Sequence, residues 1–308
     1  MSVDRDELPV CVVVAAFNRA DTVGRALKSV AAQAPRRPAE VIVVDDASTD
    51  ATADEARHHG ARVVRHRVNR GPSAARNSGI EATAQPWIAP LDADDEWLPD
   101  HLERLWSARG EHVLVAGSCV WVDEHETVTR LEGTPGSCSE LVESPADLLF
   151  PENHLPASGV MLRRDVVQRA GGYDEGLRLA EDLDLWVRML EHGSAVVLPS
   201  VVSIYHIHGG QATQDTAAMR AAHEALARRY ASRPWSSAAL LERVRVVAAW
   251  DALREEQRAG RWGTAVAKLL VLLTHPRRAA ALVALLKRRR RLRSRAARAA
   301  ASVVGTAT

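Results

Sequence analysis

The sequence has little cysteine, and the few cysteines it has form no recognisable pattern. Cys11, Cys119 and Cys138 lie far apart, and none belongs to a Cys-x-x-Cys pair. An odd number of widely spaced cysteines favours neither a disulfide framework nor a zinc knuckle. We therefore expect a protein that works in a reducing compartment, the cytoplasm.

Long apolar runs and a secretory leader are also missing. No stretch reaches the roughly 18 uninterrupted apolar residues that a membrane-spanning helix needs. The first ten residues, MSVDRDELPV, are polar and acidic, whereas a signal peptide begins with basic residues and continues with an apolar run. With 46% hydrophobic and 26% charged residues over 308 positions, the chain can build a folded core. These features predict a globular protein, soluble or attached to a membrane surface.

Acidic residues are absent from one end of the chain. Residues 261–308 contain 12 Lys and Arg and no Asp or Glu, which leaves 28 basic and 39 acidic residues in 1–260. The near-neutral total of +1 therefore hides a net charge of −11 in the first 260 residues. Two parts of such different charge need separate explanations.

The first 100 residues alternate between short apolar runs and amphipathic segments. The apolar runs predict strands at residues 10–16, 40–46, 61–67 and 86–92. The segments between them predict helices at residues 21–33, 50–59 and 72–84. Apolar strands separated by helices are typical of a parallel sheet covered on both faces, with ligands bound beyond the carboxyl ends of the strands. The predicted fold class is therefore α/β, with a mostly parallel central sheet between helices.

Carboxylates are crowded at the ends of two predicted strands. Asp45 and Asp46 close the second strand, and PLDADDEW places Asp92, Asp94 and Asp95 at the end of the fourth. Carboxylates this close together resist ionisation unless a cation or several hydrogen-bond donors compensate for them. A bound metal ion is the first interpretation, and an acidic start to the next helix, capped by Asp94 or Asp95, is the alternative. An EF-hand loop is disfavoured because tryptophan stands where its sharp turn needs glycine.

Two common phosphate-binding motifs are absent, and five other motifs take their place. The sequence contains no G-x-x-x-x-G-K-[ST], and AAFNRAD follows the first predicted strand where a dinucleotide-binding protein would have G-x-G-x-x-G. The motifs present are, in order, VVVAAFNR (12–19), VIVVDDASTD (41–50), NRGPSAARNSG (69–79), LDADDEW (91–97) and AEDLDLWVRM (180–189).

With these five motifs in this order, the chain resembles the family 2 glycosyltransferases, which have the GT-A fold. The resemblance covers residues 8–213 and implies an inverting, metal-dependent transferase that uses a nucleotide-diphospho-sugar, with a UDP-linked donor expected. It implies a nucleotide-binding half at 8–97 and an acceptor and catalytic half at 98–213. Residues 214–308 would form a helical C-terminal extension with a basic tail.

The resemblance assigns a donor site to the first four motifs. Asp94 would bind Mg²⁺ or Mn²⁺ directly, and Asp92 would hold the ribose or support the metal through water. Asp46 would read the nucleobase or the ribose, and Arg76 would lie near the base or the diphosphate. From the residues alone, Arg76 could equally be a surface cation or the partner of Asp46, and Asp45 could be structural. The nucleotide-sugar site would also include Ala15, Phe17 and Asn18.

The resemblance assigns the chemistry to the fifth motif. Asp182 would be the general base that deprotonates the acceptor hydroxyl, and Glu181 would orient the acceptor or the aspartate. From the residues alone, Asp182 and Asp184 could simply be acids in the first turn of a helix, where they favour the helix dipole. Acceptor-binding residues implied by the intervening segment are Asn153, His154, Gly172 and Tyr173.

The stretch YHIHGGQAT contains two histidines at alternate positions, which on a strand share one face. The resemblance implies that one of them closes over the diphosphate and binds the metal. His208 fits this role better than His206, because Gly209 follows it and suits a closing loop. Gln211 stands where the family often has serine, so the chain departs from the family pattern here.

After residue 213 the resemblance fades. Residues 220–230 and 238–259 predict helices, and residues 264–300 alternate two apolar blocks with a dense basic block. Basic segments that bind nucleic acid are interleaved with aromatic residues, and this one is not. Apolar and cationic residues without acids are more typical of a segment on an anionic membrane surface. The alternative is an arm that packs back on the acidic catalytic domain.

The sequence thus predicts a transferase that moves a sugar to a hydroxyl of a glycan or lipid-linked acceptor, in bacterial polysaccharide or cell-envelope biosynthesis. We expect it in the cytoplasm, peripheral on the inner face of the cell membrane. Two alternatives remain. A sugar nucleotidyltransferase would need a Gly-rich, Lys-containing loop where AAFNRAD stands, and a non-catalytic nucleotide-sugar-binding relative would be expected to lose Asp182.

Overall fold

The computed structural model describes residues 6–132, 139–149, 155–209, 211, 215–283 and 285–287. Its strands are β1 (Glu7–Ala16), β2 (Arg37–Asp45), β3 (Arg62–Arg65), β4 (Trp87–Asp92), β5 (Glu96–Trp97), β6 (Leu114–Val122), β7 (Val128–Glu132), β8 (Glu140–Val142), β9 (Val160–Arg163) and β10 (Ala195–His206). Its helices are α1 (Val23–Ala31), α2 (Thr52–His58), α3 (Pro72–Glu81), α4 (His101–Ala108), α5 (Pro145–Leu149), α6 (Arg164–Arg169), α7 (Glu181–Met189), α8 (Thr216–Arg229), α9 (Ala238–Arg258) and α10 (Trp262–Leu273), with a 3₁₀ turn, η1, at Ala157–Gly159.

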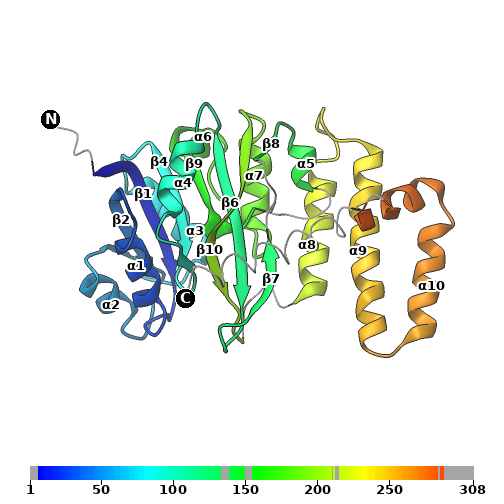
Figure 1. The fold of residues 1–308 in the computed structure, drawn as a ribbon, viewed down its shortest axis with the longest axis horizontal. Coiled ribbons are helices and arrows are strands. Elements are labelled where there is room, and N and C mark those ends of the chain that lie inside the picture. Colours follow the sequence, from blue (N-terminus) through cyan, green and yellow to red (C-terminus); the bar gives the residue numbers. More distant parts are fainter. Residues whose placement is uncertain are drawn as a thin grey trace. The chain divides into compact units, whose positions relative to one another are not determined.

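Strand β1 lies inside the sheet because its apolar residues are buried on both faces. It pairs in parallel with β2 on one side and with β4 on the other, and β2 pairs in parallel with β3 (Figure 1). Helices α1, α2 and α3 connect these four strands, as the parallel order requires. The alternation predicted for the first 100 residues is therefore confirmed, with element ends that differ by a few residues.

Beyond β4 the sheet becomes mixed. The strand order is β3-β2-β1-β4-β9-β6-β10-β5, with β7 beside β6 and β8 beside β10. Strand β9 is antiparallel to both β4 and β6, while β6 and β10 are parallel. Parallel pairing thus runs from β3 to β4 and recurs between β6 and β10, with antiparallel strands between and beside them. The later strands include short returns such as the β6–β7 hairpin, which can only join antiparallel neighbours.

Helices cover both faces of the sheet. On one face, Leu27 of α1 and Leu102 of α4 share a core with Val12 of β1. On the other face, α3 lies so close to β1 that a side chain at Gly79 would collide with Val13. Successive residues of a strand point to opposite faces, so Val12 and Val13 each anchor one helical layer. The fold is therefore a mixed sheet between helices.

The chain divides into two units, Met1–Glu143 with His154–Gly209 and Ser144–Asn153 with Gly210–Thr308. The second unit is helical: α9 packs against α8, α10 and α5, and Leu148 of α5 is fully buried. Helices predicted at 220–230 and 238–259 are present as α8 and α9. Residues 144–149, which the sequence assigns to the catalytic half, belong to this helical unit.

Candidate active site

The carboxyl ends of β1, β2 and β4 bring the acidic motifs to one edge of the sheet. In the register of β1, Ala16 lies opposite Asp45 of β2, and Ala15 lies opposite Asp92 of β4. Because parallel strands end at the same edge, Asp45 of β2 and Asp92 of β4 lie on either side of the end of β1.

Asp46 follows β2 and is buried, with protein donors around its carboxylate. Backbone N–H groups of Arg70 and Gly71 donate to it at 2.9 and 2.7 Å, and His66 Nδ1 lies 2.6 Å from Oδ1. His66 Nε2 in turn lies 2.9 Å from Ser78 Oγ on α3. The direct contact with the base or ribose stays a prediction. In this structure Asp46 fastens the loop that leads into α3, because backbone donors of that loop bind its carboxylate.

The loop after β1 is tied to the loop after β2. Asn18 Oδ1 accepts a hydrogen bond from Thr49 N at 2.9 Å, and Asn18 N donates to Ser48 Oγ at 2.9 Å. Asn18 has a φ of 51°, which is uncommon for a residue other than glycine and is found mostly where the surroundings enforce it. Among the other predicted donor-site residues, Phe17 is 43% exposed and Ala15 is partly buried. The structure therefore presents the Phe17 ring to solvent from a restrained loop.

Arg76 of α3 joins the fourth motif to the fifth. Its Nη2 donates to Asp92 Oδ1 at 2.7 Å, its Nη1 donates to Glu181 Oε1 at 2.9 Å, and its guanidinium carbon lies 5.3 Å from the centre of the Tyr173 ring. Burial alone would lower the pKa of this guanidinium, but the two carboxylates raise it well above its usual value. The carboxylate partners of Arg76 are therefore Asp92 and Glu181 and not Asp46, and the contact with the base or diphosphate stays a prediction. Arg76 is a buried cation shared by two carboxylates.

The fifth motif begins helix α7. Ala180, directly before it, has a φ of 57°, so a left-handed residue sets the direction in which the helix starts. Leu183 N donates to Asp182 Oδ1 at 2.7 Å. Burial and then the neighbouring Glu181 carboxylate raise the pKa of Asp182 to about 7. A carboxylate with a pKa this close to neutrality can both accept and release a proton, which is what a general base needs.

Asp94 lies in the turn between β4 and β5, where His208 and two arginines contact it. His208 Nε2 lies 2.8 Å from Asp94 Oδ2, and Arg19 Nε lies 3.3 Å from the same oxygen. Arg25 Nη2 donates to the backbone carbonyl of Asp94 at 2.8 Å. His206 instead lies 2.7 Å, measured from Nε2, from a carboxylate oxygen of Glu96. The structure thus brings His208, and not His206, to the carboxylate of the D-x-D motif.

Asp94 and His208 are the side chains at this turn that could ligate a divalent cation, and in this structure they contact each other directly at 2.8 Å. Such an ion uses one or two carboxylates together with phosphate oxygens and water, in place of a complete protein cage. Asp94 Oδ2 and His208 Nε2 face each other, and the Asp94 side chain keeps 14% of its surface exposed. Within the described residues no group of three or more His, Cys, Asp or Glu side chains is arranged to hold a metal ion. The chain would therefore supply two ligands and leave the rest to the substrate.

Asp95 does not cap the helix that follows. The residue before α4 is Asp100, whereas Asp95 is 2% exposed and accepts a hydrogen bond from Ser158 Oγ at 2.5 Å. Burial, followed by the charges of Asp92 and Asp94, raises the pKa of Asp95 well above its usual value. The capping interpretation is therefore wrong, because β5 intervenes between this carboxylate and α4.

The turn predicted to line the acceptor pocket lies against α3. Asn77 Nδ2 donates to the Tyr173 carbonyl at 2.9 Å, and a side chain at Gly172, where φ is 71°, would collide with Asn77. Tyr173 is 2% exposed, and its hydroxyl has no hydrogen-bond partner in the part of the chain that is described. Its ring therefore supports Arg76 from within the core instead of lining an open pocket. The other predicted acceptor residues, Asn153 and His154, lie outside the described residues.

Several residues that shape the site have no sequence signal of their own. Ser158 of η1 donates to Asp95 and accepts from the backbone N–H of Asp92, at 3.1 Å, so it holds both ends of the acidic turn. Arg19 and Arg25 come from the segment after β1. For Arg19 one signal was available, because it ends the motif VVVAAFNR, but its partner Asp94 lies in the turn between β4 and β5.

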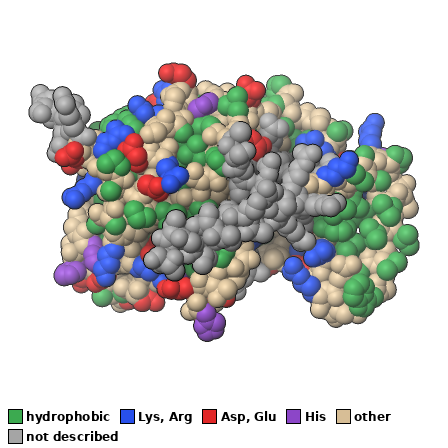
Figure 2. Space-filling view, viewed as in Figure 1, with side chains coloured by type: hydrophobic (Ala, Val, Ile, Leu, Met, Phe, Trp, Pro, Cys, Tyr) green, Lys and Arg blue, Asp and Glu red, His purple; other side chains and the backbone are tan. Residues whose placement is uncertain are grey.

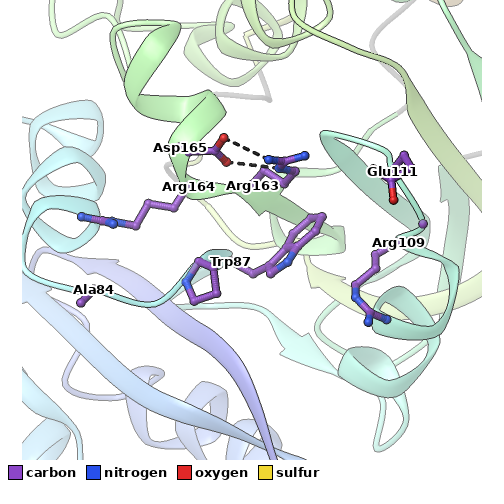
Figure 3. Close-up of a pocket in the computed structure, with 9 residues that line it drawn as sticks. Ala84, Trp87, Arg109, Glu111, Arg163, Arg164 and Asp165 are labelled. Atoms are coloured by element: carbon purple, nitrogen blue, oxygen red, sulfur yellow. Dashed lines mark hydrogen bonds and ion pairs between the residues drawn. The ribbon is translucent and has the colours of Figure 1, made fainter.

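A separate cleft of about 500 Å³ opens at the amino end of β4, away from the acidic edge. Figure 3 shows the Trp87 ring in this cleft, with Arg163 paired to Asp165 above it. Trp87 is the first residue of β4 and Asp92 is the last, so the cleft and the acidic motifs lie at opposite ends of one strand. The cleft is therefore not part of the candidate active site.

Comparison with known proteins identifies the family. Residues 11–169 match the model of the family described as "Glycosyl transferase family 2". The chain is 36% identical over 204 residues to the succinoglycan biosynthesis protein ExoU of Rhizobium meliloti, covering 60% of this chain and 58% of that protein. It is 37% identical over 250 residues to ExoO, a second succinoglycan biosynthesis protein of the same organism, covering 73% of this chain and 70% of ExoO. The match thus spans less than two thirds of the length of ExoU.

A solved structure shares the fold. The crystal structure of residues 1–349 of S. aureus TarS in complex with UDP-GlcNAc matches with a TM-score of 0.59, covering 77% of this chain and 70% of that one. The identity is 17%, so this likeness establishes the fold alone. It agrees with the α/β class predicted from the sequence.

Proposed function

The chain belongs to glycosyltransferase family 2, and we propose that it moves a sugar from a nucleotide-diphospho-sugar, UDP-linked, to a hydroxyl of a glycan or lipid-linked acceptor. The observation that carries this proposal is the Arg76 bridge. It connects Asp92, at the end of β4, to Glu181, directly before a carboxyl group whose pKa is about 7. A donor site and a proton acceptor are thereby held in one rigid arrangement.

Relatives support the biological setting of the proposal. ExoU and ExoO are named for succinoglycan biosynthesis, and a 28% identical relative from Bacillus subtilis is named as a putative teichuronic acid biosynthesis glycosyltransferase. TarS, which shares the fold, has been crystallised with UDP-GlcNAc and with UDP. We therefore place the reaction in bacterial polysaccharide or cell-envelope biosynthesis, in the cytoplasm. The buried free thiols of Cys11 and Cys119 fit that reducing compartment.

The proposed reaction is a single displacement that inverts the anomeric carbon. Asp182 takes the proton of the acceptor hydroxyl while the acceptor oxygen bonds to the anomeric carbon and the bond to the diphosphate oxygen breaks. Arg76 holds Glu181 in place beside Asp182. Asp94 and His208 would hold Mg²⁺ or Mn²⁺, which supplies charge neutralisation for the departing nucleoside diphosphate.

A donor screen tests the proposal. Purified protein is incubated with UDP-, dTDP- and GDP-sugars, with Mn²⁺ or with EDTA, and release of the nucleoside diphosphate is measured. We expect release, or a rise in melting temperature, with a UDP-sugar and only when Mn²⁺ is present. Equal responses to all donors would remove the UDP assignment, and no response to any donor in either condition would count against the proposed donor chemistry.

A further inference from the structure

Helix α10 of the second unit leaves most of its apolar side chains uncovered. Its buried residues are Ala265 and Leu272. The exposed ones are Trp262 (62%), Val266 (53%), Leu270 (59%), Val271 (57%) and Leu273 (50%). Positions 262, 266, 270 and 273 are three or four residues apart, so these side chains form one stripe along the helix. Figure 2 shows hydrophobic side chains dense over α10, at the right of the view.

Charged groups near α10 are paired within the unit, whereas the side chains of the apolar stripe are each at least half exposed. Glu256 of α9 accepts from Arg261 at 2.5 Å and from Lys268 at 2.8 Å. Residues 276–283 and 285–287, which are helical, add the exposed side chains of Val283 and Leu286. Soluble proteins rarely expose a contiguous apolar patch of this kind unless it binds a partner.

The composition around this stripe identifies the partner. From residue 261 onward the chain carries 12 Lys and Arg and no acid, eight of them within residues 287–298. A second copy of the chain would bring an equal excess of positive charge to the same interface, and the two would repel. An anionic lipid surface accepts both features, because apolar side chains enter the boundary between headgroups and acyl chains while Lys and Arg contact the headgroups.

We propose that the apolar stripe of α10, defined by Trp262, Val266, Leu270 and Leu273, docks onto an anionic lipid bilayer. The helix lies in the interface and does not cross it. In the described residues no single helix is long and apolar enough to span a membrane, and α10 and the helical residues after it are bent by 109° to each other. Docking raises the local concentration of a lipid-linked acceptor around the enzyme. The proposal rests on α10 and on composition, so it is independent of the donor chemistry proposed above.

Vesicle binding of the full chain tests the docking proposal. Co-sedimentation is measured with phosphatidylcholine vesicles that contain or lack phosphatidylglycerol. The test variant is Leu270→Glu/Leu273→Glu, and the matched control is Leu141→Glu, which changes a 51% exposed leucine in the first unit. We expect the wild type and the control to bind anionic vesicles and the double variant to bind at least about tenfold more weakly. All three positions are exposed, so melting temperatures should agree.

Two further readouts separate lipid from other partners. Tryptophan emission should shift to shorter wavelength when anionic vesicles are added, and Trp262→Phe should lose that shift while still binding. A wild type that ignores anionic vesicles at low salt would overturn the proposal, as would a double variant that binds as tightly as the wild type. A dimer in light scattering that the double variant dissociates would also overturn it, in favour of a second copy as the occupant.

Discussion

His208 Nε2 lies 2.8 Å from Asp94 Oδ2, although 114 residues separate the two in the sequence. The contact closes the segment after β10 over the turn between β4 and β5. It joins the two atoms that we propose as ligands of a divalent cation. The sheet, and not this contact, positions the two segments. Removal of either side chain should therefore weaken donor binding and leave the fold intact.

The first prediction concerns this pair. Asp94→Ala should abolish Mn²⁺-dependent binding of the nucleoside diphosphate, and His208→Ala should weaken it by about tenfold or more, because each removes one protein ligand. Titration calorimetry with UDP, with Mn²⁺ or EDTA, measures both. Asp100→Ala is a suitable control because Asp100 is 43% exposed on the side chain and pairs with Arg104. Donor binding that EDTA leaves unchanged would contradict the assignment.

The second prediction concerns the base. Asp182→Asn should leave donor binding nearly unchanged and lower kcat by ~10²-fold or more, because an amide cannot accept the proton. In the wild type, kcat should fall as the pH drops below about 7, since Asp182, whose pKa is about 7, then becomes protonated. A pH profile of kcat between 5 and 9 checks this. A flat profile, or normal turnover by the variant, would rule out Asp182 as the base.

The third prediction concerns the effect of Asp182 on the free energy of unfolding. Burial raises its pKa from 3.8 to about 7, so between these values the folded state binds more protons than the unfolded state. The contribution of Asp182 to the free energy of unfolding therefore falls as the pH rises from about 4 to about 7. Asp182→Asn should raise the melting temperature at pH 8 and do so less at pH 5. Equal changes at both values would show that the carboxyl is not destabilised in the fold.

The fourth prediction concerns the Arg76 bridge. Arg76→Met should destabilise the protein by about 3–5 kcal/mol, because it leaves the carboxylates of Asp92 and Glu181 close together without their cation. Urea unfolding measures the change. Arg70→Met is the matched control: Arg70 is 48% exposed and pairs with Glu175 on the surface, where loss of an ion pair costs about 0–1 kcal/mol. Similar losses in the free energy of unfolding for the two variants would show that the Arg76 bridge stabilises the fold no more than the surface pair does.

Much of the first unit can be predicted from the sequence alone. The apolar runs that become β1, β2 and β4 predict parallel strands, because strands buried on both faces need apolar residues at every position. Parallel order then predicts that Asp45 and Asp92 meet at one edge, and the register confirms it. In α7 the structure buries Trp186 and pairs Arg188 with Asp184, one helical turn away.

The partners of individual charged groups were decided only by the tertiary structure. Asp95 is held by Ser158, Arg76 is shared by Asp92 and Glu181, and Asp46 is used by backbone donors. Each of these contacts joins residues between 16 and 105 positions apart. Spacing along a strand or helix determines which face a side chain occupies, because that depends on local periodicity. Which charge it meets there depends on how separate elements pack, and burial then forces each buried charge to find a partner.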